Sequence, residues 1–251
     1  MTDAVLELEH VSSGYGDLTV VRDVSFAVES GSITVLLGRN GAGKTTLLKT
    51  LAGLLPIASG DVRISGASVR KQPAYQRTKR GVGFVQENKR VFKRRSVEEN
   101  LRMGAYAHRL GHKEVAARLE GAYERFPVLL MKRRDVAGHL SGGQQQMLAI
   151  AQALIGRPHL LLLDEPFSGL APSIVHDVME SIRRIKAEDG CTVLMVEQSV
   201  DLALSIADRV LVMDIGELAH VGLPTDSDIR DVVEDIYFGR GVRPKEAPSS
   251  V

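Results

Sequence analysis

The chain has 251 residues and a formal net charge of +1, with 44% hydrophobic and 25% charged residues. These are ordinary globular values, and the length suits one sizeable core with a small inserted subdomain. A single cysteine excludes an internal disulfide and a cysteine metal cluster. The sequence also lacks the apolar run of roughly 20 residues that would span a bilayer, and its start lacks a signal-peptide pattern. We therefore expect a soluble cytosolic protein, unless a partner holds it at a membrane.

The first elements predicted from the pattern are strands. Apolar and polar residues alternate over 6–9, the period of a half-buried strand, and a second strand is expected over 25–28. Tyr15 lies in the turn between them. Its ring is either ordinary surface packing or a flat face on which a base stacks, and the residues nearby leave both alternatives open.

A glycine-rich loop follows the apolar run Ile33–Leu37. Residues 38–45 have the sequence Gly-Arg-Asn-Gly-Ala-Gly-Lys-Thr, and an apolar helical segment comes next. Between a strand and a helix, G-x-x-x-x-G-K-[ST] is typical of a loop that binds a nucleoside triphosphate. Glycines allow the tight turn that turns backbone N–H groups and the helix start toward an anion. Lys44 can then reach the β- and γ-phosphates, and the Thr45 hydroxyl can bind Mg²⁺.

The next part of the chain is predicted to hold short strands over 62–64 and 81–87 and a mostly helical stretch over 96–134, opened by a capping box of Ser96 and Glu99. Lysines and arginines gather over 70–95, with Glu87 as the single acid. Such a run is typical of a solvated basic face. The alternative is a surface for an acidic partner or for anionic lipid head groups.

A second helix N-terminus is predicted where Leu140-Ser-Gly-Gly-Gln144 opens a helix over 144–155. It presents Ser and Gly backbone N–H groups, so it is either a second anion site or a helix cap and nothing more. The apolar run Leu160–Leu163 is typical of a strand buried on both faces of a parallel sheet. Its carboxyl end carries Asp164 and Glu165, where open α/β sheets bind ligands.

Those two acids have distinct expected roles. Asp164 is predicted to organise Mg²⁺, and Glu165 to orient or deprotonate a water as a general base. The rest of the core is predicted as a helix over 174–185, a buried strand Thr192–Val196 that ends at Glu197 and Gln198, a helix over 201–207, strands over 210–213 and 218–221, and a last helix over 228–238.

The order of these motifs resembles that of ATP-binding-cassette (ABC) transporter ATPases, and Leu-Ser-Gly-Gly-Gln is the most specific of them. Four further segments resemble the second ATPase of branched-chain amino-acid importers: 96–106, Ser168-Gly-Leu-Ala-Pro172, Val196-Glu-Gln198 and Asp235-Ile-Tyr-Phe-Gly239. The resemblance implies an α/β phosphate-loop NTPase (RecA-like) fold: a mixed sheet core, an N-terminal antiparallel β subdomain and an inserted α-helical subdomain. It covers 4–239 as a single domain, with the helical subdomain at about 87–158, and leaves 240–251 as a flexible tail.

The resemblance also implies a role for each matching residue. Tyr15 would stack on adenine with Val20 beneath the ring, Glu165 would be the catalytic base, and Lys44 would act on the phosphates. The triphosphate and Mg²⁺ would be held by Gly38, Arg39, Asn40, Gly41, Ala42, Gly43, Lys44, Thr45 and Thr46, with Asp164 supporting the metal. Ser141, Gly142, Gly143 and Gln144 would reach ATP bound to the opposite subunit of a head-to-tail dimer.

Two positions depart from the pattern of the superfamily. Gln198 replaces the usual switch histidine, so we expect it to sense the γ-phosphate without carrying charge, while catalysis depends on Glu165. Counting back from Glu99-Asn100-Leu101 places the loop glutamine of the family on Glu87, one residue after Gln86. We prefer Gln86 as the metal and nucleotide ligand because an acid would add negative charge there, and Glu87 is the alternative.

The function implied by the resemblance is hydrolysis of ATP to power uptake of branched-chain amino acids or related small solutes. The expected partners are a second ABC ATPase, as a paralogue in a heterodimer, two permease subunits and indirectly a solute-binding protein, at the cytoplasmic face of a bacterial membrane. The alternative is a soluble ABC ATPase acting on nucleic acid or ribosomes. We expect no nucleic acid partner, because there is no second cassette and aromatic residues are only 4%.

Overall fold

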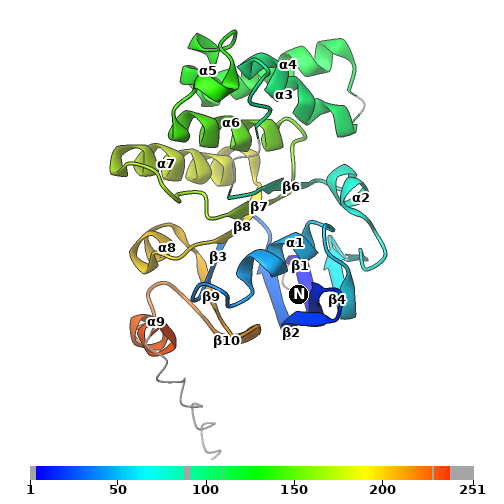
Figure 1. Ribbon diagram of the computed structural model, residues 1–251, viewed down its shortest axis with the longest axis vertical. Helices are drawn as coiled ribbons and strands as arrows, with labels where there is room; N and C mark the ends of the chain where they lie inside the picture. Colours follow the sequence, from blue (N-terminus) through cyan, green and yellow to red (C-terminus); the bar gives the residue numbers. More distant parts are fainter. Residues whose placement is uncertain (1–3, 88–90, 109, 228, 238–251) are drawn as a thin grey trace, which may run out of the picture.

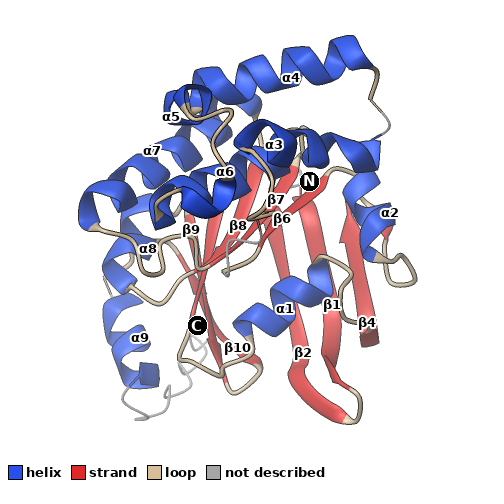
Figure 2. Ribbon diagram, turned by 45° about the horizontal axis from the view of Figure 1, so that its top comes forward, coloured by secondary structure: helices blue, strands red, loops and turns tan. Residues whose placement is uncertain are grey.

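The computed structural model describes residues 4–87, 91–108, 110–227 and 229–237. The expected tail 240–251 lies outside the described residues, as do Lys89 and Arg90 of the basic run. Two sheets and a set of helices form the structure, and the antiparallel sheet lies on the opposite side of the mixed sheet from most of the helices (Figure 1; Figure 2). This arrangement is the expected α/β architecture.

The N-terminal sheet is antiparallel and has the order β2-β1-β4-β5. Its first two strands are longer than the sequence pattern predicted, because shifts of register break the alternation of apolar and polar residues along β1. The strand bounds are β1 Ala4–Tyr15, β2 Leu18–Glu29, β4 Ile57–Ile64 and β5 Ala67–Ser68.

The second sheet is mixed and has the order β10-β9-β3-β8-β7-β6. Five of its strands are parallel, and β10 pairs with β9 in the antiparallel sense. Every residue of β3, β7 and β8 is buried, as expected for parallel strands covered on both faces. The strand bounds are β3 Ile33–Leu37, β6 Val82–Val85, β7 Leu160–Asp164, β8 Thr192–Val196, β9 Arg209–Asp214 and β10 Glu217–Gly222.

Two hydrophobic cores lie on the two faces of this mixed sheet. Side chains alternate along β7, so that Leu160 and Leu162 face the antiparallel sheet while Leu161 and Leu163 face the large helices. Helix α1 (Lys44–Leu51) belongs to the first core, between the two sheets. The second core contains α6 (Gly142–Leu154), α7 (Pro172–Asp189), α8 (Val200–Ile206) and α9 (Ile229–Tyr237).

The helical region between β6 and β7 also holds α3 (Val97–Ala105), the 3-10 turns at Tyr106–His108 and Ala137–His139, α4 (His112–Arg125) and α5 (Pro127–Met131). The capping box of Ser96 and Glu99 is present at the start of α3. Pro127 does not only close a segment, as the sequence suggested; it is the first residue of α5, a position where its missing N–H costs nothing.

A short helix that the pattern did not predict, α2 (Ala74–Lys79), divides the basic run. Arg77 on α2 is almost fully buried, and its guanidinium donates to the carbonyl oxygens of Thr50 (2.7 Å) and Leu51 (2.9 Å) at the end of α1 and to those of Val69 and Gln72. Arg77 is therefore a structural residue, and the run over 70–95 is not one continuous solvated face.

Candidate functional site

The phosphate loop connects β3 to α1 at the carboxyl end of the central strand. Gly38 and Gly43 have φ angles of 151° and 100°, which favour glycine. A Cβ on Gly38 would lie 2.3 Å from the carbonyl oxygen of Met213 on β9, so only glycine fits there. The loop borders a cavity of about 220 Å³ that is lined by Val20, Asn40, Gly41, Gly43, Lys44, Thr45, Thr46 and Glu165.

Lys44 lies at the base of this loop with 5% of its surface exposed. Its Nζ donates to the carbonyl oxygens of Gly38 (2.6 Å) and Arg39 (3.0 Å). Burial lowers the pKa of Lys44, and the carboxylates of Glu165 and Asp164 oppose that shift. The ammonium group thus has backbone ligands and, among the residues that the structure describes, no direct carboxylate partner, which suits it to receive an anion entering the cavity.

Thr45 and Asp164, which are expected to bind Mg²⁺, are also in contact. Thr45, in the first turn of α1, donates its hydroxyl to Asp164 Oδ1 at the end of β7, at 2.9 Å. Asp164 is 2% exposed, and burial raises its pKa although the Thr45 hydrogen bond acts in the other direction. A hydroxyl and a buried carboxylate that meet beside a phosphate loop are the ligand types that Mg²⁺ prefers.

Glu165 follows Asp164 directly. Its backbone has a φ angle of 48°, which is uncommon for a residue other than glycine. Its amide donates to the carbonyl oxygen of Val196 (3.1 Å), which fixes the residue between β7 and β8. Gln198 Nε2 donates to Glu165 Oε1 at 2.5 Å. The expected catalytic base and the expected γ-phosphate sensor are therefore in contact, and Glu165 also lines the cavity at the phosphate loop.

Sequence reasoning assigned no role to two residues that hold this pair. Glu197 is buried, and its Oε1 accepts the backbone N–H groups of Gln198 (2.8 Å) and Ser199 (3.2 Å). The hydroxyl of Tyr237, at the end of α9, lies 3.0 Å from the carbonyl oxygen of Gln198 and 3.1 Å from that of Gly38. The family-like segment 235–239 was the only sequence signal that pointed to Tyr237.

The two candidates for the loop glutamine lie in different places. Gln86 lines a groove between β6, α2, α3 and α6, and it is not among the residues around the phosphate-loop cavity. Glu87 is exposed, and its charge contributes to the raised pKa of Asp164. The choice between Gln86 and Glu87 as the metal and nucleotide ligand therefore stays a prediction.

Val20 and Tyr15, the two residues expected to contact adenine, also lie in different places. Val20 lines the phosphate-loop cavity, and its carbonyl oxygen lies 3.4 Å from where a Cβ of Gly43 would be. Tyr15 ends β1 with 46% of its surface exposed and does not line the cavity. An exposed ring at the end of a strand is available for stacking, which leaves adenine contact by Tyr15 a prediction.

The Ser-Gly-Gly-Gln motif begins α6. Ser141 Oγ accepts the N–H of Gln144, and Gln144 Oε1 accepts the N–H of Ser141, which is a complete capping box. Gly143 is required for packing, because a Cβ there would lie 2.2 Å from Ile174 Cγ2 on α7. Ser141 and Gln144 line a pocket that shares no residue with the phosphate-loop cavity. The motif and the phosphate loop of its own chain therefore line different cavities.

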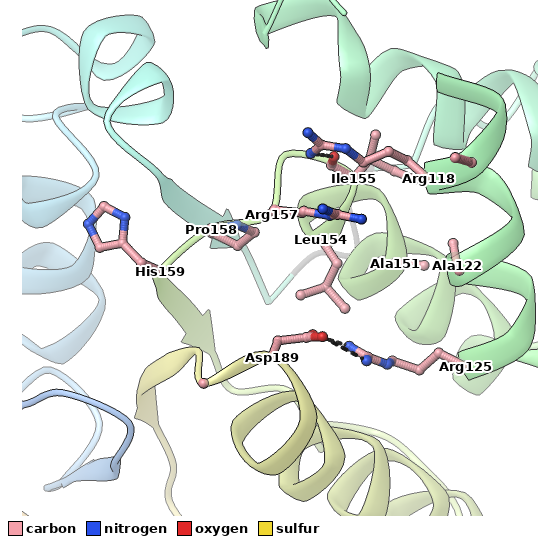
Figure 3. A pocket seen from close by; sticks show the side chains of 13 residues that line it. Arg118, Ala122, Arg125, Ala151, Leu154, Ile155, Arg157, Pro158, His159 and Asp189 are labelled. Atoms are coloured by element: carbon pink, nitrogen blue, oxygen red, sulfur yellow. Dashed lines mark hydrogen bonds and ion pairs between the residues drawn. The ribbon is translucent and has the colours of Figure 1, made fainter. Parts of the chain in front are cut away.

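A larger cavity of about 410 Å³ lies between α4, α6 and the end of α7, away from these residues. Figure 3 shows that two of its arginines are engaged: Arg118 donates to the Ile155 carbonyl oxygen at 2.7 Å, and Arg125 pairs with Asp189. The only described cysteine, Cys191, is buried nearby in the core, where burial raises its pKa to about 12. Neither feature carries chemistry comparable to that at the phosphate loop.

Residues 21–168 match the family model described as ABC transporter. The chain is 41% identical over 235 residues, which are 94% of it and 100% of the relative, to the high-affinity branched-chain amino acid transport ATP-binding protein BraG of Pseudomonas aeruginosa. It is 37% identical to the probable branched-chain amino acid transport ATP-binding protein LivF of Archaeoglobus fulgidus, over 94% of the chain and 99% of that protein.

Solved structures agree with the fold. A nucleotide-free ATP-binding cassette from an ABC transporter superposes with a TM-score of 0.83 at 26% identity, covering 93% of this chain and 98% of the other. An ATP-binding cassette of an ABC transporter in its ADP conformation gives 0.79 at 26% identity, over 94% and 99% of the two chains. These matches confirm the fold class expected from the sequence.

The residues around the phosphate loop fit a nucleotide: backbone N–H groups at a helix start, a buried lysine and a polar cavity converge at one place. The family model spans this loop and the Asp164-Glu165 pair. The chain therefore belongs to the ABC transporter family, and it is an ATP-binding and ATP-hydrolysing subunit.

Proposed function

We propose that this subunit powers the import of branched-chain amino acids or related small solutes through a membrane permease. The observation that carries the proposal is the 41% identity over essentially the whole length of a branched-chain amino acid transport ATP-binding protein. A sulfate/thiosulfate import protein of Mycobacterium tuberculosis is also 35% identical, over 90% of this chain but only 63% of that protein. Identity and coverage both favour the amino-acid class.

In the proposed reaction, ATP lies on the phosphate loop with Lys44 at its phosphates, and bound Mg²⁺ would neutralise phosphate charge. Thr45 and Asp164 would hold the metal. Within the described residues no group of three or more His, Cys, Asp and Glu side chains is placed to hold a metal ion. The other ligands would then be nucleotide and water oxygens, as is usual for Mg²⁺.

Glu165 would accept a proton from the attacking water on its carboxylate, and Gln198 would orient that carboxylate through the 2.5 Å hydrogen bond. The start of α6 would complete the site of a second ABC ATPase in a head-to-tail dimer. That Ser141 and Gln144 line a different cavity from their own phosphate loop supports this arrangement. We propose a paralogue as that partner, with residues 168–171 at the interface.

The permease would dock on the groove of about 330 Å³ that Gln86 lines. This groove lies between the mixed sheet and the helical region, which we propose as a subdomain of residues 87–158 within the domain 4–239. A permease helix in this groove would contact the mixed sheet and the helical region at once, and it would thereby couple docking to closure of the ATPase dimer. In the described ranges no helix combines the length and hydrophobicity that a bilayer span requires. We therefore propose that the permease holds this subunit at the cytoplasmic face of a bacterial membrane.

The test of the chemistry is Glu165→Gln in the transporter assembled with its permease. We expect kcat to fall by about 10²–10⁴-fold because the proton acceptor is lost, while labelled ATP still binds and dimers accumulate. Glu120→Gln, at an exposed acid on α4, is the matched control and should hydrolyse ATP at the parent rate. Hydrolysis by Glu165→Gln at the parent rate would remove Glu165 from the mechanism.

The test of the cargo begins with gentle solubilisation of membranes and identification of the proteins that copurify. Two permeases, a second ATPase and competition of labelled leucine uptake by isoleucine and valine would support the proposal. The alternative, a soluble ATPase acting on nucleic acid, predicts instead ribosomal proteins or salt-sensitive nucleic-acid binding that stimulates hydrolysis. The transport names of the relatives argue against it.

A further inference from the structure

The last described residue of the chain contacts the centre of the ATPase site. Tyr237 ends α9, about 40 positions after Gln198 and almost 200 after Gly38 in the sequence. Its hydroxyl lies within hydrogen-bond distance of the backbone carbonyl oxygens of both residues. The same Gly38 oxygen accepts a hydrogen bond from Lys44 at 2.6 Å. One hydroxyl therefore joins the first residue of the phosphate loop to the residue that holds Glu165.

Packing of α9 places this hydroxyl. Ile229, Val233 and Ile236 are spaced along one face of the helix and are buried in the same core as α8 and β9. That anchored face leaves Tyr237, the next residue along, half-buried at the edge of the site. Burial raises the pKa of Tyr237, so its hydroxyl keeps its hydrogen at neutral pH. Only one hydrogen is available, so the two carbonyl oxygens share it or compete for it.

We propose that Tyr237 is a positioning residue for ATP hydrolysis: its hydroxyl bridges the Gly38 and Gln198 carbonyl oxygens and so sets where Gln198 holds the Glu165 carboxylate. Glu197 also supports this segment, since its carboxylate accepts the Gln198 and Ser199 N–H groups. A shift of α9 would then move Gln198 relative to Glu165, while the hydrogen bonds from Lys44 to the Gly38 and Arg39 carbonyl oxygens would still hold the phosphate loop. The inference rests on the ATPase activity and not on the cargo.

The test is Tyr237→Phe, which removes the hydroxyl and keeps the ring. A neutral hydrogen bond of this kind corresponds to about a 3- to 10-fold loss in kcat, and we expect the KM for ATP to change less than about 2-fold. In a Gln198→Ala background, the same change should cost less than about 2-fold because the residue through which it acts is gone. Ile236→Val is the matched control: it removes one buried methylene from α9 and leaves the hydroxyl.

A readout independent of activity is hydrogen–deuterium exchange of the nucleotide-free protein. Tyr237→Phe should speed exchange over residues 196–200 and leave β10 unchanged, whereas Ile236→Val should not act selectively on 196–200. Three results would each overturn the proposal: an unchanged kcat in Tyr237→Phe, the same fold loss with and without Gln198, or an exchange change in 196–200 that Ile236→Val reproduces. The first two results are ratios of kcat for ATP hydrolysis to that of the parent. They do not depend on the cargo, so they remain distinct from a failure of the cargo proposal.

Discussion

Replacing Gly121 by alanine should stabilise the protein, whereas the same substitution at Gly104 should destabilise it. Gly121 lies in the interior of α4, and a Cβ there would meet no atom within 4 Å. Gly104 lies in α3 against α6, and a Cβ there would lie 2.2 Å from the carbonyl oxygen of Gln152 and 3.1 Å from Ile155 Cβ. The two sites thus share helix chemistry and differ only in the space around them.

The magnitudes follow from that difference. Alanine is favoured over glycine in a helix interior by about 0.8–1.0 kcal/mol, which is the gain expected for Gly121→Ala. At Gly104 the same gain is outweighed by a contact with backbone, which cannot rotate away as a side chain can. Overpacking of this kind costs about 1–3 kcal/mol, so the net loss is about 0–2 kcal/mol and the two variants differ by about 1–3 kcal/mol.

The assay is the melting temperature of each variant in the same nucleotide-free buffer. For a domain of this size 1 kcal/mol corresponds to about 2–4 °C, so Gly121→Ala should melt about 2–4 °C above the parent and Gly104→Ala below it. Because α6 begins with the Ser141 capping box, Gly104→Ala should also lower ATPase activity by displacing α6. Equal melting temperatures for the two variants would refute the reasoning from space around the glycine.

Two further predictions concern buried charge. Because burial raises the pKa of Asp164, the native state binds more protons than the unfolded chain, and stability falls as pH rises through the window between the ordinary and raised pKa values. Asp164→Asn should therefore raise the melting temperature of the nucleotide-free protein at pH 7, with a gain that disappears toward pH 4; a gain that persists there would contradict this assignment. Arg77→Lys should lower the free energy of unfolding by about 2–4 kcal/mol in urea titrations, because an ammonium cannot reach all four carbonyl oxygens. Arg80→Lys, at an exposed position of the same run, is the control, and an equal loss there would show that the buried contacts are not responsible.

Buried parallel strands were the most predictable elements. The bounds of β3 and β8 match the predicted runs 33–37 and 192–196, because strands covered on both faces are almost wholly apolar, with one threonine in each. The antiparallel strands β1 and β2 extend well beyond the predicted 6–9 and 25–28, since bulges interrupt their alternation. Helix α2 has six residues and no side-chain cap, so it left no periodic signal.

In the candidate site, too, some residues could be predicted from local sequence and others only from the tertiary structure. The phosphate loop and the Asp164-Glu165 pair could be predicted because each is local in sequence, and the sheet brings their strand ends together. The contact of Gln198 with Glu165 required the neighbouring positions of β7 and β8. The contact of Tyr237 with Gly38 and Gln198 joins distant segments through one hydroxyl, and no local pattern encodes it.

At the start of α6, a helix cap and the anion site that we propose involve the same residues. Ser141 Oγ uses a lone pair to accept the Gln144 N–H, and this leaves its own hydrogen free to donate. The capping box fixes the direction of that hydroxyl, while the remaining N–H groups of the first turn keep the positive end of the helix dipole available. Binding a phosphate of a second subunit there would not require the box to open. The proposed anion site therefore depends on the helix cap. Without the cap the first turn of α6 would fray, and its hydrogen-bond donors would not be held in place for the phosphate of a partner.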